Sequence, residues 1–380
     1  MRHRWRILAV AVALICALCA CGGLGASPGV PQGDSWTAAA SGGVSAAPHP
    51  KPTGPPVYKV SAASQALTAT LGIQVFWSPD SAASVAVDAN RIFNYIVGLG
   101  ANSVGINFFF FTNGADPTTV YGLRRRTPSP AMIGEIIADA RAHGLRVLVR
   151  PLLNEDNIID ANGDWRGSIA PPSVQAWFQS YFHFLRPYFI AAQRNGATSF
   201  NVGSELDSLA PDENEWTSFN ARAATLFSGQ LEYAVNYGRW QEDPSYEPVP
   251  DAAVDAYPQL GLGDHATVGR LTAAWVQWLG HQPESVLRRT VLQEVGIAAA
   301  AGTYAEPARV APAGTPLDIP VQVKWFEAAC TAAKRTSMAG IYFYDVNGTD
   351  QPSDAASYSP GSFIGRGDRA IKTCFASGWS

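Results

Sequence analysis

Two glutamates at the ends of apolar, strand-like runs are the residues of this sequence best suited to acid–base chemistry. Glu205 ends the run "SFNVGSE", and Glu294 lies near the end of the run "RTVLQEVG". Two facing carboxyl groups can hydrolyse a glycosidic bond, one as proton donor and the other as nucleophile. In the retaining reaction the two groups lie about 5–5.5 Å apart. The donor must keep its proton near neutral pH, which a position withdrawn from water favours.

A third run, "VLVRPLLNED", also ends in carboxylates and competes with this pair. It contains Asn154 and Glu155, so Glu155 is an alternative proton donor. A glutamate at a strand end can also cap a helix or form an ion pair. The order of the strands must therefore decide which two glutamates belong together.

Short apolar runs alternate with longer helical patterns after about residue 58. The runs are apolar on both faces, as buried parallel strands are. One helical pattern, residues 129–144, has Ser129 as a possible N-cap, Pro130 at its first position and Gly144 just past its end. Other helices are expected over residues 172–196, 213–229, 268–280 and 321–336. Strands are expected over residues 72–77, 103–111, 146–153, 199–205, 231–237, 252–257, 289–296 and 339–347.

Eight strands with intervening helices predict an α/β fold, a single (β/α)8 or TIM barrel. An open doubly wound sheet is the alternative, but no glycine-rich phosphate turn follows the first strand. Active sites of such barrels lie at the carboxyl ends of the strands. Glu205 then ends the fourth strand and Glu294 the seventh. Glu155 follows the third, and moving it to the fourth would need an extra strand upstream, such as residues 57–60.

This placement of two glutamates resembles glycoside hydrolase clan A, in which the first is the acid/base and the second the nucleophile. The runs "FNVGSEL" and "LQEVG" look like the corresponding motifs of glycoside hydrolase family 113, the β-1,4-mannanases. The segments "YAVNYGRW", "VDAYPQLG" and "AGIYFYDVN" look like the fifth, sixth and eighth strand ends of that family. The resemblance covers roughly residues 72–375. It implies a retaining hydrolase of a β-linked glycan, with β-mannan favoured, that needs no metal or organic cofactor.

The resemblance also implies roles for residues around the two glutamates. Tyr257 matches the tyrosine that hydrogen-bonds the nucleophile and would hold that carboxylate ionised and oriented. Trp77 and Trp240 would offer faces on which sugars stack. Arg150 and Asn154, at the end of the third strand, would bind sugar hydroxyls. Because a charge in an apolar run needs a partner, Arg150 is equally suited to a structural ion pair.

Two positions depart from the pattern of the clan. Ser204 stands where many members have an asparagine that binds the sugar 2-hydroxyl, and Tyr344 stands where many have tryptophan. Both changes concern the subsite of the cleaved sugar, so they leave its identity open. One alternative is a clan A enzyme acting on another glycan, such as a cell-wall galactan or arabinan. A second is a cell-surface glycan-binding protein on a barrel that has lost turnover.

The composition of the chain indicates which classes of molecule it binds. The chain has 380 residues, a formal charge of −4 and 11 tryptophans. Outside the N-terminus and the short "LRRR" at residues 123–126 there is no basic cluster, so nucleic-acid binding is not indicated. The tryptophans mildly favour a carbohydrate ligand, and a monomer is expected. No G-x-S-x-G sequence supports a serine hydrolase.

The first 21 residues read as an export signal. Basic residues precede an apolar run, and the run ends in "LCAC", which resembles a bacterial lipobox with Cys21 as the lipid acceptor. A plain signal peptide cut nearby is the alternative. Residues 22–57 are rich in glycine, serine, proline and alanine and are expected to form a flexible tether. The catalytic domain would span residues 58–380, outside the cytoplasm, anchored to the membrane by lipid or secreted.

Only two of the five cysteines lie outside the signal region, Cys330 and Cys374. Two cysteines in an exported chain usually pair, so a disulfide between the last predicted helices is expected. Two buried free thiols are the alternative. No cluster of histidine and cysteine has the spacing of metal ligands, so no metal site is predicted.

Overall fold

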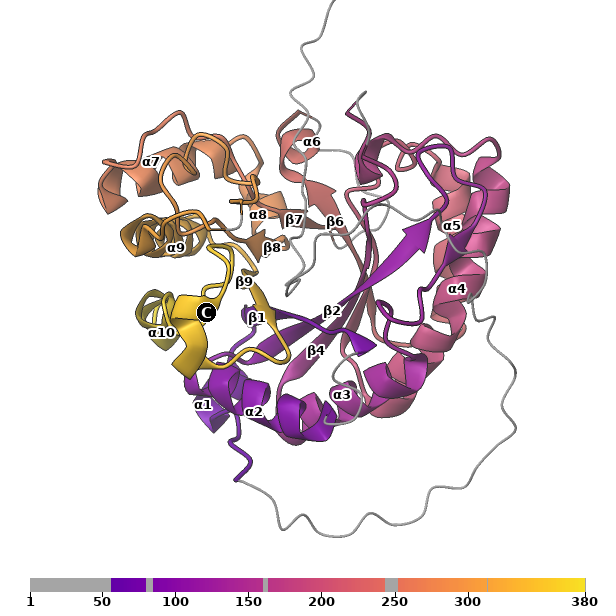
Figure 1. The fold of residues 1–380 in the computed structure, drawn as a ribbon, viewed down its shortest axis with the longest axis horizontal. Coiled ribbons are helices and arrows are strands. Elements are labelled where there is room, and N and C mark those ends of the chain that lie inside the picture. Colours follow the sequence, from indigo (N-terminus) through magenta and orange to yellow (C-terminus); the bar gives the residue numbers. More distant parts are fainter. Residues whose placement is uncertain (1–55, 80–84, 160–162, 243–251, 313, 380) are drawn as a thin grey trace, which may run out of the picture.

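The computed structural model describes residues 56–79, 85–159, 163–242, 252–312 and 314–379. Strands lie at the centre of the molecule and helices surround them (Figure 1). The predicted signal peptide, the lipobox with Cys21 and nearly all of the predicted tether lie outside the described residues.

Eight parallel strands close into a barrel because β1 pairs with both β2 and β9. A ninth, short strand, β3 (Val120–Tyr121), pairs antiparallel with the end of β2. The predicted TIM barrel is confirmed, and no strand occupies residues 57–60. The barrel strands are β1 (Thr70–Phe76), β2 (Ser103–Thr112), β4 (Arg146–Leu153), β5 (Ser199–Ser204), β6 (Gln230–Asn236), β7 (Ala252–Asp255), β8 (Val291–Val295) and β9 (Gly340–Asn347).

The helices begin and end where local signals place them. Ser129 caps α3 by accepting a hydrogen bond from the Met132 amide at 3.2 Å, and Gly144 has a left-handed φ of 81° just after the helix. All five predicted helices are present, as α3, α4, α5, α7 and α9, whereas the other helices were not predicted. The helices are α1 (Ala62–Ala66), α2 (Val85–Gly98), α3 (Pro130–Ala142), α4 (Val174–Asn195), α5 (Glu213–Ala224), α6 (Tyr237–Glu242), α7 (Val268–Leu279), α8 (Glu284–Leu287), α9 (Ile319–Arg335) and α10 (Asp368–Ala376).

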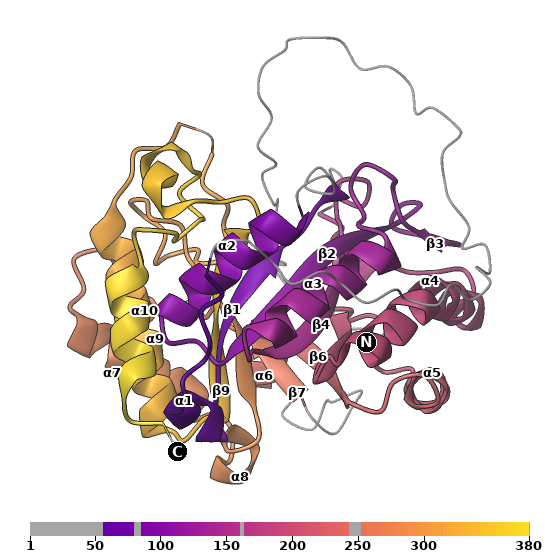
Figure 2. The ribbon, with the colours of Figure 1, turned by 90° about the horizontal axis from the view of Figure 1, so that it is seen from below.

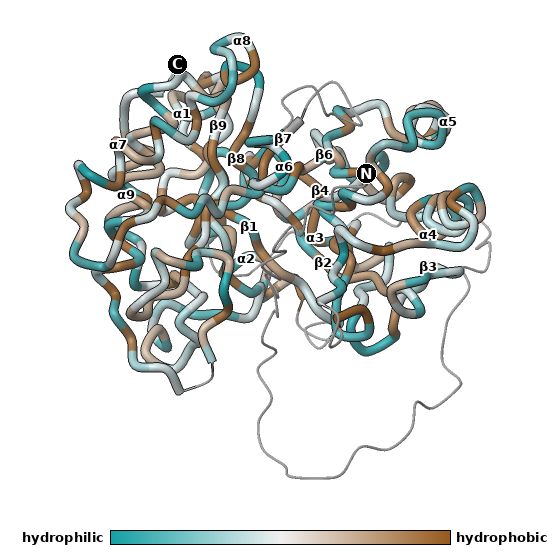
Figure 3. Tube along the Cα trace, turned by 90° about the horizontal axis from the view of Figure 1, so that it is seen from above, coloured by the Kyte–Doolittle hydropathy of each residue, from teal (hydrophilic) through white to brown (hydrophobic). Residues whose placement is uncertain are grey.

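The apolar core lies between the strands and the ring of helices. Figure 2 shows α2 and α3 side by side against the outside of the barrel, where α3 contacts β2 and β4. Hydrophobic residues recur along the central strands, and α5 carries many hydrophilic residues at the periphery (Figure 3). None of the helices among the described residues combines the length and apolarity needed to cross a membrane.

The inside of the barrel holds buried amides that bond to one another. Asn107 donates to Gln74 at 3.0 Å, Gln74 donates to the carbonyl of Gln293 at 2.8 Å, and Asn201 donates to the Gln293 side chain at 2.8 Å. Gly105 leaves room for this network, because a Cβ there would lie 1.7 Å from the Gln74 side chain. These bonds satisfy polar groups below the barrel mouth and fix the strands that carry the site.

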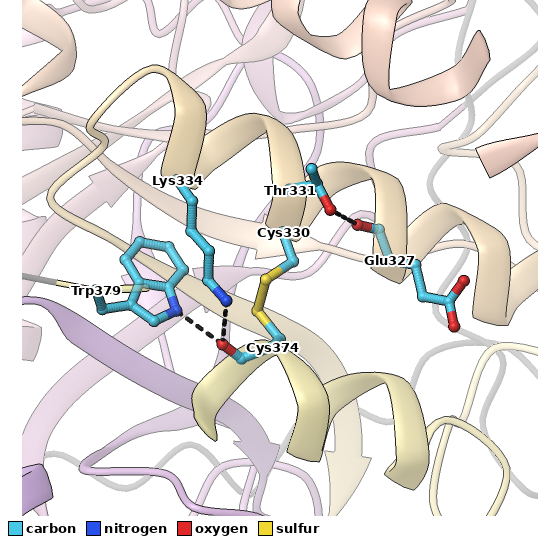
Figure 4. The surroundings of a disulfide bond; sticks show 6 residues. All are labelled: Glu327, Cys330, Thr331, Lys334, Cys374 and Trp379. Carbon is cyan, nitrogen blue, oxygen red and sulfur yellow. Dashed lines mark hydrogen bonds between the residues drawn. A yellow bond between two sulfur atoms is a disulfide. The ribbon is translucent and has the colours of Figure 1, made fainter. Parts of the chain in front are cut away.

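The predicted disulfide between Cys330 and Cys374 is confirmed and joins α9 to α10. Figure 4 shows one further link across this contact and one within the C-terminal segment. Lys334 Nζ and Trp379 Nε1 both donate to the Cys374 carbonyl, at 2.6 Å and 2.9 Å. Lys334 lies on α9 and Trp379 follows α10, so the last helix is held against α9 by one covalent bond and one hydrogen bond.

Removing the disulfide should destabilise the barrel without changing its site. The bond closes a loop of 44 residues, so replacing Cys330 and Cys374 with alanine is expected to lower the free energy of unfolding by about 2–4 kcal/mol. Urea unfolding of the oxidised wild type and the double variant measures the difference. Unchanged midpoints would show that the bond contributes nothing to stability, and reduced wild type is the matched control.

Candidate active site

Glu294, on β8, is buried among hydrogen-bond donors. Arg150 Nη1 donates to Oε1 of Glu294, and the Tyr257 hydroxyl donates to Oε2 at 2.6 Å. Arg150 is completely buried, and its Nη2 lies 2.6 Å from Oδ2 of Asp255. Each carboxylate oxygen of Glu294 therefore has a donor, one of them positively charged. This arrangement fixes the orientation of the carboxylate, as a nucleophile needs.

Glu205 is the first residue after β5 and has an unusual backbone conformation. Its φ is 55°, in the left-handed region that residues other than glycine rarely adopt. Its amide donates to the Ala234 carbonyl at 2.9 Å, and its Oε1 accepts from Asn236 Nδ2 at 2.7 Å. Both partners belong to the neighbouring strand β6. The end of β6 thus fixes both the backbone and the carboxyl group of Glu205.

The surroundings of Glu205 favour its protonated form. Burial raises the pKa of Glu205 to about 8; the charge of Arg166 and the bond from Asn236 lower it, and the charges of Glu294 and Asp207 raise it. At neutral pH the group therefore keeps its proton. Both glutamates are 3% exposed, but Glu294 accepts from an arginine and a tyrosine whereas Glu205 accepts from the amide of Asn236, a difference that suits a nucleophile and a general acid.

The other predicted ligands of β4 and β5 lie deep in the barrel mouth. Of the two roles open to Arg150, the structure places it in an ion pair with Glu294 and Asp255. Asn154 is buried and its Oδ1 accepts from the Asp156 amide at 3.0 Å, so its oxygen fixes the turn after β4. Ser204 is buried, with its hydroxyl 3.5 Å from Oδ1 of Asn201.

The predicted aromatic contacts separate into two groups. Trp77, Tyr257 and Tyr344 line one pocket with a volume of about 430 Å³, and Tyr257 connects it to Glu294 through its hydroxyl. The rings of Tyr257 and Tyr344 meet edge to face, with centroids 6.4 Å apart. Trp240 lies elsewhere: it is 3% exposed and packs against Trp278, with centroids 4.9 Å apart. Trp77 and Trp240 are both 3% exposed, so neither presents an open face, and sugar stacking on them stays a prediction.

Glu155, the alternative proton donor, is paired with an arginine. Its Oε1 accepts from Arg166 Nε at 3.0 Å and from the Arg166 amide at 2.9 Å. Both side chains are buried. Because β4 is the third strand of the barrel and β5 the fourth, Glu155 follows the third strand and Glu205 the fourth. The strand order thus separates Glu155 from the pair of Glu205 and Glu294.

Three residues of the site were not predicted from the sequence: Asp255, Asn236 and Arg166. Asp255 carries a charge inside the apolar run "AAVDAY", a pattern that calls for a buried partner, and this partner is Arg150. Asn236 ends β6 next to Glu205. Because site residues of such barrels lie at the carboxyl ends of strands, its position could have predicted a role in the site. Arg166 opens the short 3-10 helix η2 (Arg166–Ser168) in a loop, where no strand pattern marks it.

Unequal environments for two carboxyl groups at one barrel mouth are what glycoside hydrolysis requires, and fold and site together define a TIM-barrel glycoside hydrolase of clan A. A family model makes this assignment specific. Residues 80–361 match the model of Glycoside Hydrolase Family 113, and the chain belongs to that family. No curated protein matches the chain by sequence.

Solved structures share the fold at low sequence identity. A GH113 β-1,4-mannanase in a complex is 17% identical with a TM-score of 0.68, over 81% of this chain and 99% of that chain. The GH113 β-mannanase AaManA from Alicyclobacillus acidocaldarius, in complex with ManMIm, is 20% identical with a TM-score of 0.68, over 82% and 99%. GH5_18 from Streptomyces cattleya, in complex with GlcNAc, is 14% identical with a TM-score of 0.52, over 82% and 80%.

The hydroxyl of Tyr257 should matter for catalysis and little for folding. A hydrogen bond to a charged group contributes about 1.5–3 kcal/mol, so Tyr257→Phe is expected to lower kcat by about 10- to 100-fold. KM should change little if the bond mainly orients Glu294 for attack. Steady-state kinetics and the melting temperature of the variant check both points. An unchanged kcat would contradict the role, and Tyr304→Phe, at a hydroxyl that donates to the Val321 carbonyl, is a matched control.

Proposed function

We propose that the chain is an exported, retaining β-1,4-mannanase in which Glu294 is the nucleophile and Glu205 the acid/base. One observation carries the assignment of roles. Both oxygens of Glu294 accept hydrogen bonds, from Arg150 and Tyr257, whereas burial raises the pKa of Glu205 to about 8. The first carboxyl group is thus suited to attack as an anion and the second to donate a proton.

The reaction has two steps in this proposal. In the first, Glu294 attacks the anomeric carbon, the glycosidic bond breaks, and the proton of Glu205 passes to the leaving oxygen. In the second, the ionised Glu205 takes a proton from water while the water oxygen attacks the anomeric carbon and releases Glu294. Two displacements at one carbon return the starting β configuration.

The pocket beside Glu294 is the proposed site of the sugars on the non-reducing side of the cleaved bond. Neither glutamate is in its lining, but Tyr257 and Tyr344 are, and the Tyr257 hydroxyl donates to Glu294. Because the leaving oxygen must face Glu205, the leaving portion of the glycan extends away from this pocket. Trp77 and Asp345, also in the lining, offer an aromatic edge and a carboxyl group to sugar hydroxyls.

β-1,4-Mannan is the favoured substrate because the chain belongs to family 113 and similar structures of that family are described as β-1,4-mannanases. The test incubates purified protein with β-1,4-mannan, galactan, arabinan and cellulose and follows the first product by NMR. Release of β-configured mannose oligosaccharides supports the proposal. Hydrolysis of galactan or arabinan alone would replace mannan as the substrate. An α-configured first product from β-1,4-mannan excludes retention. Binding without hydrolysis of any glycan would support a binding protein instead.

Export and lipid anchoring are proposed from the first 21 residues, with Cys21 as the lipid acceptor. The basic start, the apolar run and the closing "LCAC" support this proposal. Fractionation of cells that express the wild type and Cys21→Ala tests it. The wild type is expected with the membrane and the variant outside it, and equal distributions would exclude the anchor.

A further inference from the structure

We propose that Arg166 is a positioning residue for Glu205: it holds a fixed positive charge beside the acid/base and thereby sets the pH range in which this group can act. The inference rests on the role proposed for Glu205. Arg166 is 3% exposed and lies in a loop between β4 and α4. Burying a guanidinium in such a loop costs free energy of desolvation, so other interactions must compensate for it.

The guanidinium of Arg166 is anchored by a carboxylate. Glu155 Oε1 accepts from the side-chain Nε at 3.0 Å and from the backbone amide of Arg166 at 2.9 Å. One oxygen thus fixes both the start of η2 and the direction of its first side chain. This contact gives Glu155 a purpose other than catalysis.

The loop that carries Arg166 is also tied to the chain that leaves Glu205. Ser208 donates from its amide to the Gly167 carbonyl at 2.9 Å and from its hydroxyl to the Ile169 carbonyl at 2.6 Å. Ser208 lies three residues after Glu205 in the sequence. The two hydrogen bonds hold η2 against the segment that begins at the acid/base, so Arg166 and Glu205 keep a fixed relation.

Several elements bring charged or titratable groups near Glu205. Burial raises the pKa of Glu205, and Arg166 is the first charge that opposes this effect. Glu294 and Asp207 act in the opposite direction, and the bond from Asn236 acts with Arg166. Two further groups interact with Glu205, Tyr237 of α6 and Asp255 of β7.

This charge balance serves both steps of a retaining reaction. Glu205 must hold a proton in the first step and be ionised in the second, so its pKa must stay near the working pH. Burial and two nearby carboxyl groups alone would keep Glu205 protonated and slow the second step. Arg166, anchored by Glu155, offsets that tendency.

The test is the pH dependence of kcat/KM, whose basic limb reports the acid of the free enzyme. Arg166→Met is expected to move this limb upward by about one pH unit, because an opposing charge is lost. Arg166→Lys keeps a positive charge and should leave the limb near its wild-type position. Arg288→Met is the matched control, because it removes an exposed pair with Glu284 on α8, and its basic limb should not move.

A second variant is needed in case Arg166→Met misfolds, because this change leaves Glu155 buried without its ion pair. Arg166→Met combined with Glu155→Gln removes both charges, and an upward shift is expected that is smaller than in the single variant, because the negative charge of Glu155 is also lost. A limb that stays in place in both variants, in protein with a wild-type melting temperature, would overturn the inference.

A direct titration separates this inference from the proposed function. The carboxyl carbon of Glu205, assigned by comparison with Glu205→Gln, is followed by NMR in the wild type and in Arg166→Met. A higher pKa in the variant supports the inference even if no glycan is hydrolysed, in which case only the proposed function fails. Normal hydrolysis by the wild type with equal pKa values of Glu205 in both proteins overturns the inference alone.

Discussion

Glu294→Gln is expected to lower kcat for a β-1,4-mannan substrate by about four orders of magnitude or more, since it removes the attacking group of the first step in the proposed mechanism. Glutamine keeps the shape of the side chain but lacks the charge that Arg150 and Tyr257 surround. Substrate binding should persist, because the change affects the transition state more than the ground state. The measurement is single-turnover hydrolysis, with binding followed separately by calorimetry.

A smaller side chain at the same position tests the role of Glu294 more sharply. Glu294→Ala leaves space for azide, which can attack the anomeric carbon of an activated aryl β-mannoside from the side that Glu294 occupied. The expected product is an α-mannosyl azide. A β-configured azide, or wild-type turnover by Glu294→Gln, would contradict the assignment. Glu284→Gln, at an exposed pair on α8, controls for the substitution itself.

The strand count was predictable because buried parallel strands are apolar on both faces and so appear as continuous runs. Once the eight runs are placed in order, the sequence alone identifies the carboxyl ends of the fourth and seventh strands. Glu205 and Glu294 lie at these ends. The short strand β3 was not predicted, because Val120–Tyr121 is too brief to form a pattern. It extends the end of β2 and does not change the count.

The partners of the two glutamates were less predictable, for reasons that differ. Asp255 and Arg150 each carry a charge in an apolar run, which indicates a buried pair but does not name its members. Arg166 depends on a loop returning to the barrel mouth, a contact that no local pattern encodes. Trp240 shows that position alone is also insufficient. It follows a strand end, where a sugar contact is expected, yet its ring packs on Trp278.

Glu205→Gln is expected to lower kcat for β-1,4-mannan by about 10²- to 10⁴-fold, the range that general acid–base catalysis contributes. The loss should be smaller for an aryl β-mannoside with a good leaving group, because that oxygen departs without a proton. The basic limb of the pH profile should also disappear, since the titrating group is gone. Glu155→Gln, in the neighbouring "NED" sequence, serves as the comparison. If Glu155→Gln abolished the basic limb while Glu205→Gln kept it, the order of roles would be reversed.

The same variant should be more stable than the wild type at high pH, and the sign follows from the pKa. Burial raises the pKa of Glu205 from 4.5 to about 8 in the folded protein. The folded state therefore binds more protons than the unfolded state between these values, and stability falls as pH rises through that window. Glutamine does not titrate, so the advantage of Glu205→Gln should grow from about pH 4.5 to pH 8 and then stay constant. Urea unfolding at pH 5 and pH 9 measures it, and an equal difference at both would show that the fold does not disfavour the ionised group. A stability gain accompanied by a loss of turnover would mean that the fold bears a cost to keep this carboxyl group protonated where catalysis needs it.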